Sequence, residues 1–135
     1  MKTRTIPAAF ASATVTFLLS WLVFGILLIN FYNTNATHYA GLMKDRPEMW
    51  AIIIANICYG FMLAFILNLA GIKSPVKGFT TGFLIILLGN AGFDLMYYAT
   101  INMYGLNVLV VDILTNAIIG GLSGAVSALV LGSKY

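Results

Sequence analysis

The chain has very little charge for its length. Of its 135 residues, 8% are charged and 61% are hydrophobic. Soluble domains carry about 25% charged and about 45 to 50% apolar residues, so this composition excludes an ordinary water-soluble domain. The formal charge of +3 is also spread along the chain, whereas nucleic-acid-binding surfaces gather basic residues in a stripe. We therefore expect the partner to be the lipid bilayer and not a nucleic acid.

Residues that carry enzyme chemistry are equally scarce. Cys58 is the single cysteine and His38 the single histidine, so the sequence offers neither an internal disulfide nor a set of Cys and His ligands spaced for a metal ion. The Gly-x-Ser-x-Gly order found around the nucleophile of many hydrolases does not occur. The sequence predicts a non-enzymatic protein with no catalytic residue, metal or cofactor.

Long apolar runs dominate the rest of the sequence. They lie near residues 10–31, 49–70, 76–98 and 106–131, and each has the roughly 20 residues that a helix needs to cross a bilayer. Continuous runs of this length favour helices over a membrane β-barrel, whose strands alternate over about ten residues. We expect an all-α membrane protein, with residues 1–135 forming one domain of four transmembrane helices in an up-down bundle.

Basic residues predict the orientation of this bundle. An even number of spans places both termini and the turn between the second and third spans on one side, which carries Lys2, Arg4, Lys73, Lys77 and Lys134. The other side carries only Lys44 and Arg46. Because Lys and Arg are enriched in cytoplasmic loops, both termini are predicted to be cytoplasmic, in a multi-pass protein of the inner (plasma) membrane. Aromatic residues gather at the opposite, outer boundary: Tyr32, Trp50, Tyr97, Tyr98 and Tyr104.

Small residues recur at intervals of four in the third and fourth spans. They are Gly78 and Gly82 in the third span, and Gly120, Gly124 and Ala128 in the fourth, where Gly121 adds a small residue on the adjacent ridge. Apolar side chains gain little by leaving lipid for one another, so close backbone approach over small residues supplies much of the attraction between helices. These residues either pack helices within one bundle or form a contact with a second copy or a larger membrane partner.

Residue spacing predicts that several polar residues of the spans lie close together. Asp94 and Asp112 each lie nine residues from Met103, the centre of the turn between the third and fourth spans, and Asn90 and Asn116 each lie thirteen residues from it. In an antiparallel hairpin such pairs share a depth, and residues four apart share a helix face. Asn56 reaches a similar level from the second span.

The two carboxyl groups of this cluster need an explanation. A carboxylate at the middle of a span costs about 2.5 to 3.5 kcal/mol on insertion scales, and no Lys or Arg lies near either aspartate in sequence. One interpretation is that protonated or hydrogen-bonded carboxyls join the helices near the outer surface. The other is a site that handles a proton or a small cation.

The overall pattern resembles a known group of proteins. An aromatic first helix reading Ser20-Trp21-Leu22-Val23-Phe24-Gly25, and a last helix opened by Asp112 and completed by Gly and Ala, are similar to the small bacterial four-span membrane proteins grouped as a family of unknown function. The resemblance implies four helices and no assigned activity. Our leading hypothesis is an oligomeric transporter or channel for a small cation or proton. The alternative is an accessory or assembly subunit that uses the Gly-rich fourth helix to dock on a larger membrane complex.

Overall fold

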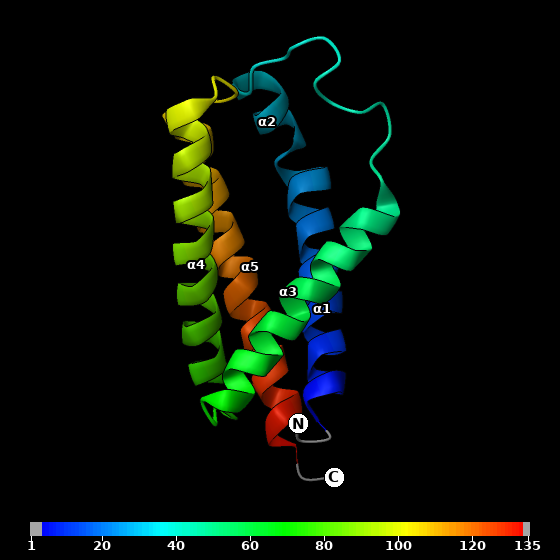
Figure 1. Ribbon diagram of the computed structural model, residues 1–135, viewed down its shortest axis with the longest axis vertical. Coiled ribbons are helices and arrows are strands. Elements are labelled where there is room, and N and C mark those ends of the chain that lie inside the picture. The colour runs from blue at the N-terminus through cyan, green and yellow to red at the C-terminus, as the bar shows by residue number, and fades with distance from the viewer. Residues whose placement is uncertain (1–3, 134–135) are drawn as a thin grey trace.

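Four long helices form the protein, whose computed structural model describes residues 4–133. They are α1 (Thr5–Leu22) with its π-helical extension η1 (Val23–Leu27), α3 (Met49–Leu69), α4 (Pro75–Thr100) and α5 (Leu106–Gly132). Each is long and apolar enough to cross a membrane, which confirms the predicted all-α class with four spans. Successive long helices are antiparallel, so α1 begins and α5 ends at the same end of the bundle (Figure 1).

The first span differs most from its predicted range of residues 10–31. Its helix begins at Thr5 and the span ends at Leu27, after which the backbone bends at Leu28 and a short helix, α2 (Ile29–Asn35), follows. The early start reflects packing, because Ala8 and Ala9 are fully buried. The early end was hidden from the sequence because the apolar run continues through the bend to Phe31.

The small residues of α4 and α5 pack against each other within the chain. A Cβ atom added at Gly82 or at Gly124 would lie 3.1 Å from the Cα of the other residue, and one added at Gly78 would meet the Ala128 side chain. Gly120 packs against Ile86 in the same way. Such backbone approach is what small residues permit in a membrane. These small residues, hereafter the glycine seam, therefore face the partner helix of their own hairpin.

The first hairpin and the second meet along α1 and α5. Gly60 of α3 lies against Ala9 and Ala13 of α1, which holds the first hairpin together. Between the hairpins, Thr16 Oγ1 donates a hydrogen bond to Ser123 Oγ at 2.8 Å, and Ser12 Oγ donates to the Ser123 carbonyl at 3.3 Å. By contrast, α3 approaches α4 at their lower ends and separates from it toward the upper end (Figure 1).

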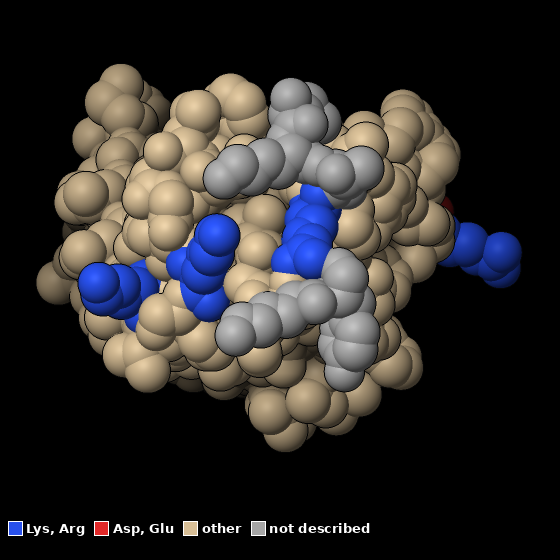
Figure 2. All heavy atoms as spheres, turned by 90° about the horizontal axis from the view of Figure 1, so that it is seen from below, with Lys and Arg blue, Asp and Glu red and all other residues tan. Residues whose placement is uncertain are grey.

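The two ends of the bundle differ in chemistry. At the end shown at the top of Figure 1, the segment after α2 is tied to the turn between α4 and α5: the Thr37 amide donates to the Met103 carbonyl at 2.7 Å, and Tyr39 Oη donates to the Asn102 carbonyl at 3.1 Å. The opposite end carries Lys and Arg side chains (Figure 2). Arg4 precedes α1 there, and Lys73 and Lys77 flank the start of α4.

Candidate functional site

Asp112 of α5 is the best-anchored carboxyl group of the predicted cluster. Tyr32 Oη donates a hydrogen bond of 2.6 Å to its Oδ1 atom, and Asn116 Nδ2 donates one of 2.9 Å to its Oδ2 atom. Asn116 lies one turn further along the same helix, so the helical repeat itself brings its amide to the carboxyl. Both oxygens of the Asp112 carboxyl group therefore already accept a hydrogen bond.

Tyr32 reaches this carboxyl because the chain bends after the first span. The π-helical segment Val23–Leu27 and the bend at Leu28 place α2 across the upper end of the bundle, and the Tyr32 ring packs edge-on against Phe24 at 5.7 Å between centroids. Burial, together with the hydrogen bond to Asp112, raises the pKa of the Tyr32 hydroxyl above its ordinary value. The hydroxyl therefore stays protonated and acts as the donor.

Asp94 of α4 completes the pair in a different way. Its carboxyl group is close enough to the Asp112 carboxyl and to the Asn90 amide to interact electrostatically with both. Its Oδ2 atom, however, is buried and has no hydrogen-bond partner among residues 4–133. A buried carboxylate oxygen without a partner is costly, and two carboxyl groups join in a hydrogen bond only when one of them carries the proton. The geometry suits one proton, or one cation, held by the pair.

A cavity of about 300 Å³ lies beside Asp94, between the four long helices. Polar side chains from all four helices line it: Thr16, Ser20, Asn56, Tyr59, Asn90, Asp94 and Asn116. Leu63, Ile86 and Ile119 contribute apolar wall to the same cavity. The cavity thus combines one carboxyl group with amides, hydroxyls and an apolar wall.

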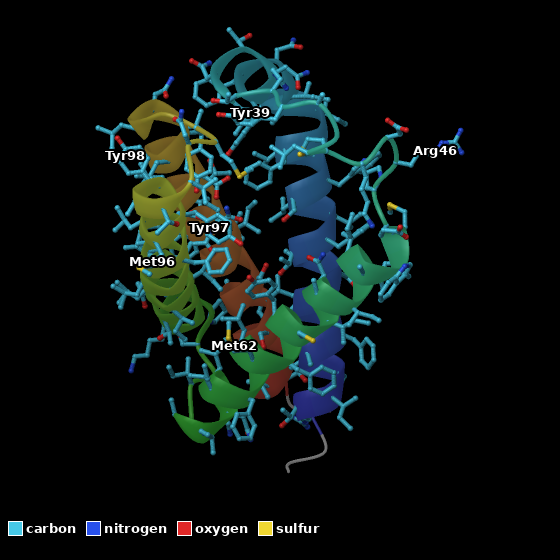
Figure 3. All side chains as sticks on the ribbon, turned by 45° about the horizontal axis from the view of Figure 1, so that its top comes forward. Tyr39, Arg46, Met62, Met96, Tyr97 and Tyr98 are labelled. Atoms are coloured by element: carbon cyan, nitrogen blue, oxygen red, sulfur yellow. The ribbon has the colours of Figure 1, made fainter. Side chains whose placement is uncertain are left out.

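Tyrosines surround the upper part of the site. Tyr104 Oη donates to the Asp94 main-chain carbonyl at 3.4 Å, and burial, with the neighbouring carboxyls, raises the pKa of Tyr104. In Figure 3, Tyr97 lies toward the middle of the molecule and Tyr98 lies on the outer side of α4. Tyr97 packs against Phe93 with 4.7 Å between ring centroids, and Phe93 lines the cavity.

The structure brings together most of the cluster predicted from the sequence. Asn90, Asp94, Asp112 and Asn116 form one group on α4 and α5. Asn56 lines the cavity from α3, but its amide donates to the Ile52 carbonyl of its own helix at 2.8 Å. Among residues 4–133, no group of three or more His, Cys, Asp and Glu side chains is arranged to hold a metal ion.

Several residues of the site were missed by sequence reasoning. Tyr32 was assigned only to the aromatic belt, because its contact with Asp112 depends on the bend at Leu28. Thr16, Ser20 and Tyr59 also line the cavity. Hydroxyl groups are common in membrane helices and usually bond their own backbone, so nothing in the sequence marked these three.

Comparison with known proteins is consistent with this membrane architecture. No curated protein and no solved structure matches the chain. Residues 6–129, which include the second and third spans whole and nearly all of the first and fourth, match the family described as "Predicted membrane protein (DUF2177)". The chain therefore belongs to the DUF2177 family of membrane proteins, whose function is unknown.

Proposed function

We propose that this protein is a non-enzymatic protein of the inner membrane that binds a proton or a small cation at Asp94 and Asp112 and exchanges it across the bilayer. The observation that carries the proposal is the contrast between the two carboxyl groups. Asp112 has a hydrogen-bond donor on each oxygen, whereas Asp94 Oδ2 is buried without a partner among the described residues. A neutral Asp94 beside a charged Asp112 satisfies both environments.

A transported proton or cation also needs a path from the cavity to the other side of the membrane. The absence of room for such a path inside one bundle supports an oligomeric form. Leu63 of the cavity wall and Leu67, one turn further along α3, are buried, and the glycine seam closes the space between α4 and α5. A path inside one bundle would displace this packed core, so the transporting form uses a second copy. The alternative role as an accessory subunit has less support, because Gly120 and Gly124 already face α4.

Proton binding and flux test this proposal together. Infrared spectra of the protein in lipid at neutral pH should contain the C=O band of a protonated carboxyl group, and Asp94→Asn should remove it. In liposomes that contain only this chain and a trapped pH-sensitive dye, the parent should carry protons or a small cation, and Asp94→Asn should abolish that flux. Asp45→Asn, which removes an exposed carboxyl in the outer loop, is the control and should change neither result.

Two results would contradict the proposal. In a buffer without small metal cations, a parent protein without a protonated-carboxyl band at neutral pH would show that both aspartates are solvated carboxylates. Flux that survives Asp94→Asn would show that the carboxyl pair is structural.

The proposed orientation is tested separately. With the basic end in the cytoplasm, a cysteine replacing His38 in a background without Cys58 should react with a membrane-impermeant maleimide on intact cells. A cysteine replacing Ser74, an exposed residue in the turn before α4, should react only after the cells are permeabilised. The reverse labelling pattern would place the carboxyl pair near the cytoplasmic surface.

A further inference from the structure

We propose that the cavity beside Asp94 binds an organic monocation, a protonated amine or a quaternary ammonium with an attached apolar group. This inference rests on the proposed function and names the class of cation that the site exchanges for its proton.

The first argument is size. The cavity measures about 300 Å³, at the lower end of the range of small-molecule sites. A water molecule occupies about 30 Å³ of the liquid, so a proton or a bare metal ion would leave most of the cavity to be filled.

The second argument is the chemistry of the wall. A metal ion needs several oxygen, nitrogen or sulfur ligands at once, and Asp112 already uses both of its oxygens on Tyr32 and Asn116. Asp94 is then the one carboxyl group of the cavity lining. An organic ammonium needs only one carboxylate, because its carbon atoms contact apolar and aromatic surface. Leu63 and Ile119 supply apolar surface, and aromatic rings such as those of Tyr59 and Phe93 attract cations.

The third argument is access. Phe93 of α4 is 63% exposed and Tyr59 of α3 is 45% exposed, although both line the cavity. The cavity therefore opens on the side of the bundle, between two helices that separate toward the upper end (Figure 1). In a membrane-spanning bundle this side faces lipid, from which a lipophilic amine enters without crossing a polar surface.

The exchange conserves charge. When the ammonium binds, the O–H bond of the protonated carboxyl breaks and its proton passes to water. The pair then carries two negative charges, and the bound cation returns the net charge of the site to its earlier value. Binding should consequently release about one proton for each cation bound.

The test uses benzyltrimethylammonium and its neutral carbon analogue, neopentylbenzene, with the full chain in nanodiscs of uncharged phosphatidylcholine. The parent should bind tritiated benzyltrimethylammonium saturably and release a proton. Asp94→Asn should weaken this binding about tenfold or more, the loss expected when a charge-assisted contact is removed. Asp45→Asn should bind as the parent does.

Each other outcome overturns the inference. Equal competition by neopentylbenzene would show that the cavity recognises apolar shape alone, and competition by sodium at the concentration of the organic cation would favour an inorganic ion. If saturable binding is absent while the protonated-carboxyl band persists, the organic-cation inference fails and the proposed function stands. If the band is absent as well, both fail.

Discussion

Gly124→Leu should lower the free energy of unfolding by about 1 to 3 kcal/mol or more, the range for forcing extra carbon atoms into a packed interior. At this position even a Cβ atom would lie 3.1 Å from the Cα of Gly82 and would meet the Gly78 carbonyl. Backbone atoms cannot move aside as a flexible side chain can, so α4 and α5 must separate. Unfolding by SDS in mixed micelles, followed by circular dichroism, measures the change.

Gly92→Leu is the matched control. Gly92 lies in α4, the other helix of the same hairpin, and nothing lies within 4 Å of a Cβ atom added there, so this variant should unfold as the parent does. Equal effects of the two substitutions would contradict the glycine seam. A third result would assign the glycines to a contact between copies: a parent dimer that Gly124→Leu converts to an equally stable monomer.

The second large effect is expected at the carboxyl pair, where the two aspartates should respond in opposite ways. Asp112→Asn should destabilise the protein by about 2 to 3 kcal/mol, because hydrogen bonds to a charged group contribute about 1.5 to 3 kcal/mol. Its new amide NH₂ group would face either the Tyr32 hydroxyl or the Asn116 amide, both of which are donors. Asp94→Asn should leave stability nearly unchanged, because the new amide can donate to Asp112 and a neutral group replaces the neutral carboxyl of the proposed pair.

A double-mutant cycle with Tyr32→Phe identifies the cause. Tyr32→Phe should destabilise the parent but should add little in the Asp112→Asn background, because the hydrogen bond of 2.6 Å is already lost or weakened there. Additive effects of the two substitutions would mean that Tyr32 contributes through packing on Phe24 and not through Asp112. Equal destabilisation by Asp94→Asn and Asp112→Asn would contradict the assignment of one neutral and one charged carboxyl.

Hydropathy was sufficient to predict the four spans, because a bilayer requires long apolar helices whatever their packing. It could not locate the end of the first span. Leu28 and Ile29 are as apolar as the residues before them, so the bend between η1 and α2 cannot be predicted from hydropathy. Spacing of four residues predicted close approach at Gly120 and Gly124, but the choice between α4 and a second copy depends on helix rotation, which spacing does not contain.

For the carboxyl pair, too, the sequence predicts one part of the arrangement and packing determines the other. The short turn around Met103 fixes the depths of Asp94 and Asp112 by counting, because antiparallel helices rise equally per residue. Counting does not fix which way the helices face, nor that Tyr32, far away in sequence, covers Asp112. The cavity was also beyond sequence reasoning, because it exists only where α3 separates from α4, and that separation results from the Gly60 contact on α1 and the glycine seam on α5.

The short turn between α4 and α5 bears on how the chain enters the membrane during synthesis. Thr100 ends α4 and Leu106 begins α5, so the two aspartates emerge from the ribosome close together in time. If α4 entered the bilayer alone, Asp94 would bear the full penalty of a carboxyl group without a partner. Insertion of both helices as one hairpin would bring Asp112 and Asn116 to Asp94 at the moment of entry, and we therefore expect the last two spans to insert as a single unit.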